Sequence, residues 1–160
     1  MTVRSIVSPE TVNLPKGEVT AIYIMDVQLN QYDMSEANLM LLNRIGHKAV
    51  YVLSYGGRSR MAVVEGSAFV SEPIPSDRVS IRLEGLDLDQ AWEGIVRSIA
   101  PGLRADLPLR DAVAEHKRVT SLNKRIESLK KKLGTTKQNH ERRDIHRLIR
   151  ELEEERDNPP

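Results

Sequence analysis

The chain has no cysteine among its 160 residues, which excludes disulfide scaffolds, zinc sites with thiolate ligands and cysteine nucleophiles. Its apolar runs are only a handful of residues long, far short of the roughly 20 that cross a bilayer. The first residues show no basic start followed by an apolar stretch, so no secretory signal is visible. We expect a soluble cytoplasmic protein that does not contact a membrane.

Aromatic residues, proline and glycine are nearly missing from the C-terminal third. All six aromatic residues precede Leu109, all eight prolines lie outside residues 110–158, and Gly134 is the one glycine of nine within that range. Aromatic and turn residues are typical of a packed globule, whereas long charged side chains around a thin apolar stripe are typical of an extended helix. We predict a head domain over residues 1–108 and a helical tail over residues 109–160.

The formal net charge of +1 hides an uneven distribution of charged residues. Residues 1–109 carry 10 Lys and Arg against 13 Asp and Glu, whereas residues 110–150 carry 13 against 5. The last ten residues carry one Arg against five acidic residues. The tail is therefore a basic segment with an acidic end.

Strand and helix patterns alternate in the head. Helical spacing predicts one helix that ends at Gly46 and a second that begins at the N-cap Asp87, where Gln90 completes a capping box. Gly56-Gly57 predicts a hairpin turn, because both positions tolerate positive φ. The α+β fold that we predict is a small mixed or antiparallel sheet with helices on one face. Its strands are expected over residues 3–7, 19–29, 49–55, 59–65 and 79–83, and its helices over 35–45 and 87–100.

Apolar residues of the tail recur at the spacing of a heptad seam. Alternating intervals of 3 and 4 residues define a helical interface in two groups. The first group is Val119, Leu122, Ile126, Leu129 and Leu133, and the second is Ile145, Leu148 and Leu152. Between the two groups, Gly134-Thr-Thr suits a helix end followed by a turn. We predict an antiparallel α-helical hairpin, a coiled coil. One continuous helix that dimerises is the alternative, because Gly134 costs it only about 1 kcal/mol relative to alanine.

Motifs of common enzyme classes are missing. The chain has no Gly-x-x-x-x-Gly-Lys phosphate loop, no Gly-x-Gly-x-x-Gly, no His-Glu-x-x-His and no Gly-x-Ser-x-Gly. His140 and Asp144 lie one helical turn apart, a spacing that suits two metal ligands, but a solvated helix surface is the more ordinary interpretation. We therefore assign no catalytic residue, no metal site and no cofactor, and we favour a protein that is not an enzyme.

A divalent-metal-dependent nuclease is the enzymatic alternative. Such an enzyme needs carboxylates on adjacent strands around a cation that neutralises charge on the phosphate. Asp26 and Glu65 on neighbouring strands are the residues that would serve. Asp26 has a simpler interpretation as an ion-pair partner of Lys48.

The basic tail points more strongly to binding. A stripe of Lys and Arg can neutralise phosphates and release counterions without reading base sequence. Charged, solvated faces are also ordinary in coiled coils, and the acidic end can pair with basic residues of the other helix. No aromatic residue lies between the basic ones, so stacking on single-stranded bases is not expected. The nucleic-acid contacts that we predict are Lys130, Lys131, Lys132, Arg142 and Arg143.

Residues 8–14 (SPETVNL) resemble the "SPETIN-hydrophobic" motif of a bacterial family, the domain of unknown function numbered forty-three ninety-one. The strand, helix and hairpin follow that motif in the family's order. Residues 83–88 (LEGLDL), which come next, are similar to the family's "LxGxNLDxLYE" segment, and the charged coil follows them. The chain departs from the pattern at Trp92, where we expect Tyr, and at Asn139, where we expect an aromatic residue. Residues 63–66 (VVEG) lack an expected lysine, and the family's usual N-terminal extension is missing.

The resemblance implies a gene that accompanies Swi/Snf-type helicases and adenine-N6 DNA methyltransferases in bacterial defence and restriction-modification clusters. It assigns no catalytic residue. We therefore expect a non-catalytic accessory subunit of such a system, which binds a helicase or methyltransferase component and contacts the DNA backbone without sequence preference. The nuclease and a self-associating coiled-coil scaffold, which would be a homodimer, are the alternatives.

Overall fold

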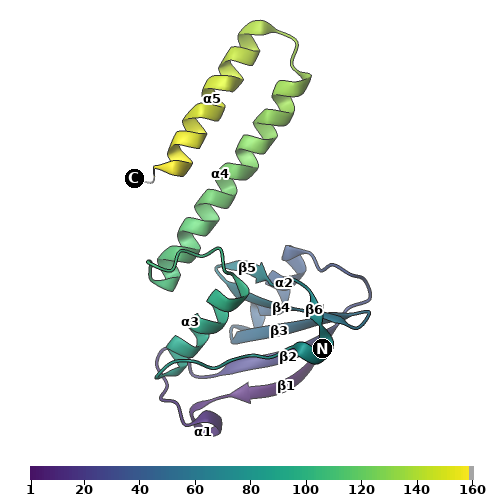
Figure 1. Ribbon diagram of the computed structural model, residues 1–160, viewed down its shortest axis with the longest axis vertical. Coiled ribbons are helices and arrows are strands. Elements are labelled where there is room, and N and C mark those ends of the chain that lie inside the picture. Colours follow the sequence, from purple (N-terminus) through teal and green to yellow (C-terminus); the bar gives the residue numbers. More distant parts are fainter. Residues whose placement is uncertain (159–160) are drawn as a thin grey trace. The chain divides into compact units, whose positions relative to one another are not determined.

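The computed structural model describes residues 1–158 and divides into two units, Met1–Arg104 and Ala105–Pro160, each of which is described by itself (Figure 1). The first unit contains one six-stranded sheet, in which five strands follow the order β1-β2-β3-β4-β5 and β6 also pairs with β4. Strands β2 and β3 are parallel and the other pairs are antiparallel, so the sheet is mixed. The α+β class is confirmed. The strands are β1 (Thr2–Val7), β2 (Ile22–Gln28), β3 (Lys48–Tyr55), β4 (Arg58–Glu65), β5 (Ser67–Val70) and β6 (Ile74–Pro75).

A two-residue turn joins β3 to β4, as predicted. Gly56 and Gly57 have φ values of 57° and 77°, and Tyr55 pairs with Arg58 across the turn. This tight connection needs two consecutive residues with positive φ, a conformation that glycine adopts without steric cost. The turn therefore fixes the register of the central hairpin.

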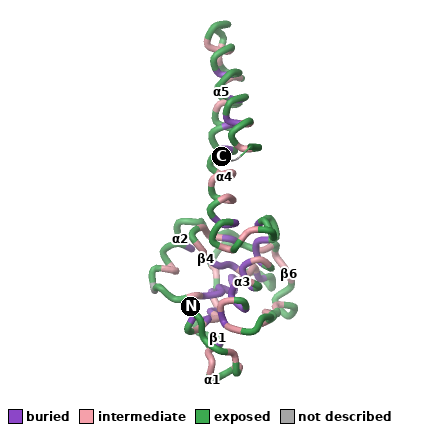
Figure 2. The backbone as a smooth tube through the Cα atoms, turned by 90° about the vertical axis from the view of Figure 1, so that its left-hand side faces the viewer, coloured by how far each residue is buried: buried purple, intermediate pink, exposed green. Residues whose placement is uncertain are grey.

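The helices of this unit cover opposite faces of the sheet. Helix α2 (Glu36–Leu42) continues into a short 3-10 helix over Asn43–Ile45. Its Leu39 packs in a cluster with Tyr51 and Ala62. Trp92 of α3 (Leu88–Ile99) instead donates a hydrogen bond to Glu65, whose side chain points to the other face because it alternates with its neighbours along β4. Figure 2 shows α2 and α3 on the two sides of β4.

This arrangement corrects the expectation that the helices share one face. In β3, every residue from Ala49 to Leu53 is at most 4% exposed, so both faces of the strand need a cover. The helical pattern of residues 87–100 identified the apolar side of α3 but carried no information on which face of the sheet it meets. Asp87 caps α3 as predicted by accepting a hydrogen bond from the Gln90 N–H, while Gln90 itself accepts from Leu86.

Residues 79–83 do not form the predicted strand. Val79, Ile81 and Leu83 are half-buried and Ser80 and Arg82 are exposed, so the alternation in the sequence reflects one covered side. No neighbouring strand pairs with this segment, which has no regular secondary structure. The sequence pattern also failed to predict a short helix, α1 (Pro9–Val12), and the short strands β5 and β6.

The second unit is an antiparallel helical hairpin of α4 (Leu109–Thr135) and α5 (Asn139–Asp157). Gly134 lies inside α4, and Thr136 is the C-cap instead. Within residues 1–158 no helix is both long enough and apolar enough to span a bilayer. The core of the hairpin is contributed by both helices and contains Leu122, Ile126, Ile145, Ile149 and Leu152, with Leu129 and Leu133 partly buried against it.

The helical interface differs from the prediction at one position of α5. Leu148 is 44% exposed, whereas the adjacent Ile149 is 7% exposed and belongs to the core. Spacings of 3 then 4 and of 4 then 3 both fit a heptad, so two adjacent apolar residues left the phase of the seam ambiguous. Val119 is half-buried and lies outside the core cluster.

Alanine substitutions at these adjacent positions test the phase of α5. Ile149→Ala removes buried methyl groups, and we expect it to destabilise the hairpin by about 2–4 kcal/mol. Leu148→Ala changes an exposed side chain and should cost roughly 0.5 kcal/mol or less. Hydrogen exchange of α5 amides measures local opening of the hairpin in the full chain. Equal effects of the two substitutions would contradict the core described above.

Candidate nucleic-acid and partner interfaces

The two helices of the hairpin differ in charge. Helix α4 carries eight Lys and Arg against three Asp and Glu, whereas α5 carries five against seven. The basic character of the tail is therefore concentrated on α4. Charged side chains near the seam pair across the two helices, and this pairing decides which cations remain available to a ligand.

Two of the predicted nucleic-acid contacts are engaged in ion pairs between the helices. The Lys130 ammonium lies 3.4 Å from a carboxylate oxygen of Glu153, and the Lys132 ammonium lies 3.1 Å from one of Glu141. Exposed pairs of this kind contribute about 0–1 kcal/mol each. They do neutralise the local charge, so Lys130 and Lys132 are less suited to a phosphate than the sequence suggested.

Arg142 has a structural role. Its guanidinium donates hydrogen bonds of 3.1 Å to the carbonyl oxygens of Leu133 and Thr136, where α4 ends. The last carbonyl groups of a helix have no partner within the helix, and a basic side chain can satisfy them. Arg142 of α5 therefore caps α4.

Arg118 provides the reciprocal cap. Its guanidinium donates to the carbonyl oxygens of Glu155 and Arg156, at 2.7 and 3.2 Å, near the end of α5. The hydrogen bond to the Glu115 carboxylate raises the pKa of Arg118 above its ordinary value. Each helix thus supplies an arginine to the C-terminal end of the other. Arg118 lies inside α4 and carries no local sequence signal for a cap, so the fold-back geometry is needed to assign it.

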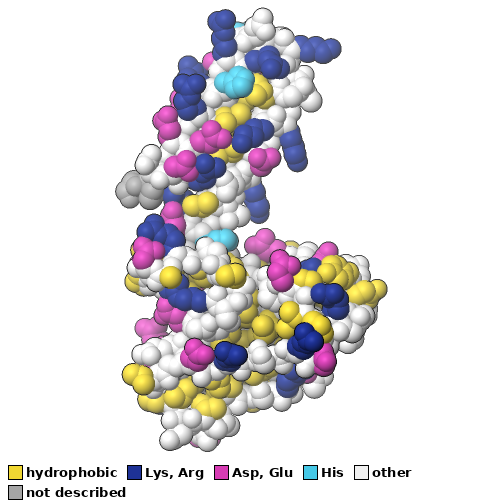
Figure 3. Space-filling view, in the orientation of Figure 1, with side chains coloured by type: hydrophobic (Ala, Val, Ile, Leu, Met, Phe, Trp, Pro, Cys, Tyr) yellow, Lys and Arg dark blue, Asp and Glu magenta, His cyan; other side chains and the backbone are white. Residues whose placement is uncertain are grey.

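Lys131 and Arg143 are the two predicted contacts that remain free. Both side chains are exposed, and among residues 1–158 neither has an acidic oxygen within 4.0 Å. Figure 3 shows Lys and Arg side chains along the edge of α4 that faces away from α5. Of the five predicted contacts, these two are the ones whose charge is available to a phosphate.

The carboxylates proposed for a nuclease do not meet. Asp26 is on β2 and Glu65 is on β4, with β3 between them, so their strands are not neighbours. The strand register separates them by roughly 10 Å across the sheet and roughly 13 Å along β4, too far to share one ion. Asp26 pairs with Arg4 at 2.8 Å, and Lys48, its expected partner, pairs with Glu65 instead.

His140 and Asp144 are the other residues that the sequence offered as metal ligands. Asp144 lies 3.1 Å from Arg147 and His140 is exposed, so the predicted pair is a solvated helix surface. Within residues 1–158 no group of three or more His, Asp or Glu side chains is placed to hold an ion.

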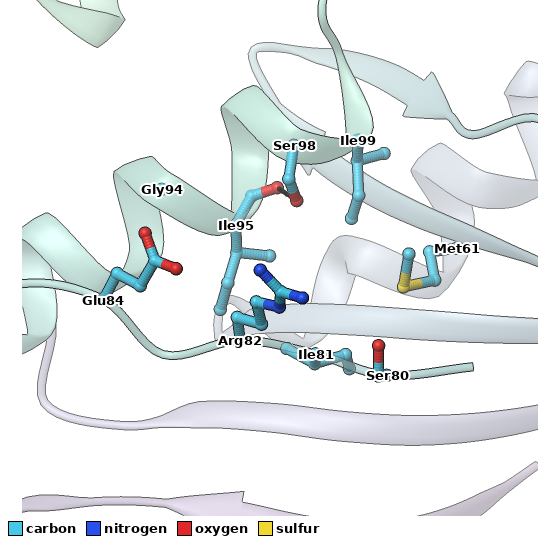
Figure 4. A pocket seen from close by; sticks show the side chains of 9 residues that line it. All are labelled: Met61, Ser80, Ile81, Arg82, Glu84, Gly94, Ile95, Ser98 and Ile99. Carbon is cyan, nitrogen blue, oxygen red and sulfur yellow. Dashed lines mark hydrogen bonds between the residues drawn. The ribbon is translucent and has the colours of Figure 1, made fainter. Parts of the chain in front are cut away.

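A pocket of about 330 Å³ lies between α3 and residues 80–84 (Figure 4). Its walls are mainly apolar, with Met61, Ile95 and Ile99, and the Arg82 guanidinium extends into the space between them. The Ser98 hydroxyl donates to the Ile95 carbonyl oxygen at 2.7 Å, so its proton is directed into the helix. This pocket can hold a small group, but it does not pair a nucleophile with a base.

An apolar pocket of about 210 Å³ opens on the sheet near β1. Val3, Tyr23, Met25 and Tyr51 contribute to its lining, and the ring of His47 lies 4.9 Å from that of Tyr23. Burial raises the pKa of the Tyr51 hydroxyl above its ordinary value. The pocket lies on the face that α2 covers, beside the edge of the sheet, and its surface is almost entirely apolar. It therefore suits an apolar side chain of a partner.

Comparison with known proteins places the chain in one family. Residues 1–155 match the family described as "Domain of unknown function (DUF4391)", and the chain belongs to it. No curated protein and no solved structure matches the chain.

Glu65 stabilises the head, and a substitution measures its contribution. Glu65→Ala removes the acceptor of the buried Trp92 N–H, a hydrogen bond of 2.7 Å, and the partner of Lys48. An unsatisfied buried donor costs about 1–3 kcal/mol, so we expect a loss of that size in the free energy of unfolding. Trp92 is the only tryptophan, and its fluorescence reports on this unit. Glu93→Ala, which removes a half-buried i,i+4 ion pair within α3 but no contact of Trp92, is the control and should cost about 1 kcal/mol or less. An equal loss in both variants would contradict the assignment.

Proposed function

We propose that this member of the DUF4391 family is a non-catalytic accessory subunit of a bacterial DNA-modification, restriction or helicase-based antiviral defence system. It acts in the cytoplasm, where it binds a helicase or methyltransferase component and contacts the DNA backbone. The observation that carries the proposal is the presence of two surfaces of different chemistry on separate units, an apolar pocket in the head and a positively charged helix in the hairpin.

The apolar surface supports the contact with a partner protein. Val3 and Ile6 of β1 are 48% and 45% exposed, although both are large apolar side chains. Val3 pairs with Met25 and Ile6 with Tyr23, so the two side chains share the face of the apolar pocket. Exposed apolar side chains beside an apolar pocket are typical of an interaction site. We define Val3, Ile6, Tyr23 and Met25 as the β1 patch.

The hairpin supports the contact with DNA. The core of the hairpin packs between the two helices, so the opposite side of α4 is free to present charge to solvent. Contacts from Lys and Arg to phosphates position a protein on a duplex without reading its sequence. This is the behaviour expected of a subunit that steadies DNA for a catalytic partner.

Co-expression tests the protein contact. The tagged chain is expressed with the helicase or methyltransferase encoded beside its gene, and the partner that co-purifies is measured. Val3→Glu places a charge in the β1 patch, and an unpaired charge in an apolar interface should reduce recovery by about tenfold or more. Ser5→Glu alters the opposite face of the same strand and should leave recovery unchanged.

Thermal unfolding of both variants shows whether β1 is still folded. Failure of the wild-type chain to retain either component would contradict the accessory role. Equal recovery with Val3→Glu and Ser5→Glu would show that the β1 patch is not the interface.

A further inference from the structure

Four basic residues recur on α4 at intervals of seven. Arg110, Lys117, Lys124 and Lys131 form this series, which we define as the basic row. Seven residues turn an α-helix through nearly two complete turns, so the four side chains lie on one side of α4. Successive members are about 10.5 Å apart along the axis, and the row extends over about 31 Å.

The basic row lies on the side of α4 that faces away from α5. Lys124 is two residues from both Leu122 and Ile126, which are buried in the seam, and this spacing places it on the opposite side of the helix. All four side chains are exposed.

The row contains most of the cations of α4 that have no ion pair. Lys130, Lys132 and Arg118 are held by acidic groups of either helix or by carbonyls of α5. In contrast, no member of the basic row has an acidic oxygen within 4.0 Å in the part of the chain that the structure describes. Arg125 also lacks such a partner, but it lines a hollow beside the seam with Glu151 and Glu155, so the cations on the outer side are the four of the row.

We infer that the basic row is a binding site for the phosphate backbone of double-stranded DNA. The inference rests on the DNA contact of the proposed function. It replaces the five contacts predicted from the sequence with a linear site, and Lys131 is the one residue that belongs to both sets. A row of about 31 Å matches roughly nine base pairs at 3.4 Å each. Lysine is a compact charge on a flexible stem, so each member can reach a phosphate without fixed geometry.

The chemistry beside the row favours a duplex over other polyanions. Thr120, Ser121 and Ser128 flank the row together with one acidic residue, Glu127, which lines a shallow hollow with Lys124 and Lys131. These polar side chains provide no apolar face to enter a lipid interface. Neither α4 nor α5 has an aromatic residue on which the bases of a single strand could stack. Evenly spaced cations along a straight helix suit a regular line of phosphates.

Fluorescence anisotropy of a labelled duplex of about 20 base pairs tests the site, with the full chain across about 50–200 mM salt. The row variant combines Lys117→Gln, Lys124→Gln and Lys131→Gln. The control combines Lys130→Gln, Lys132→Gln and Arg147→Gln, which removes the same charge from cations that are already paired. Circular dichroism shows that both variants keep the hairpin.

We expect the row variant to bind about tenfold or more weakly at the lowest salt concentration, and the control to stay within about twofold of the wild type. The slope of log K against log salt should fall in magnitude by about 2.7 for the row variant, since each lost phosphate contact contributes about 0.9.

Three results would overturn the inference. The first is equal weakening of both variants, which would make binding a matter of total charge. The second is no binding of the wild-type chain at low salt. The third is row-dependent binding to phosphatidylserine vesicles without binding to the duplex. Co-purification with the partner does not depend on this row, so it separates failure of the DNA site from failure of the accessory role.

Discussion

Strand β3 is buried on both faces, so the N-terminal unit must supply a covering layer on each side of its sheet. Helix α2, in the crossover between the parallel strands β2 and β3, covers one face, and α3 covers the other. Trp92 is the largest side chain of α3. Its indole N–H donates to the Glu65 carboxylate, and the Lys48 ammonium lies over the ring. Trp92 and Glu65 come from different elements of the unit, and in the structure they contact each other.

The reciprocal arginine caps have the corresponding role in the hairpin. Each arginine donates to two carbonyl oxygens at the end of the other helix, whereas each interhelical lysine pair is a single solvent-screened contact. Arg118 and Arg142 therefore help to fix the register of α5 along α4. That register brings Lys130 to Glu153 and Lys132 to Glu141, and it leaves the basic row without an acidic partner from α5.

Local chemistry made several elements predictable from the sequence. Gly56-Gly57 specified its turn and Asp87 its helix start, because both depend on residues adjacent in the chain. The antiparallel hairpin followed from its heptad pattern. The choice between Leu148 and Ile149 did not, because it depends on the rotation of α5 against α4. The strand predicted at residues 79–83 failed for a similar reason, since alternation reports a covered side and says nothing about a hydrogen-bonding neighbour.

The candidate site was less predictable than the fold, because the availability of a cation depends on what lies opposite to it. The sequence favoured Lys130–Lys132 for their density, yet ion pairs engage two of those three, whereas Lys117 and Lys124 were not among the predicted contacts. The acids of α5 strengthen the asymmetry. Helix α5 carries more acidic than basic residues, so it repels a polyanion, while α4 attracts one. With a net charge of +5 on α4 and −2 on α5, the hairpin can therefore bind DNA on one side and in one orientation, which the net charge of +1 for the chain conceals.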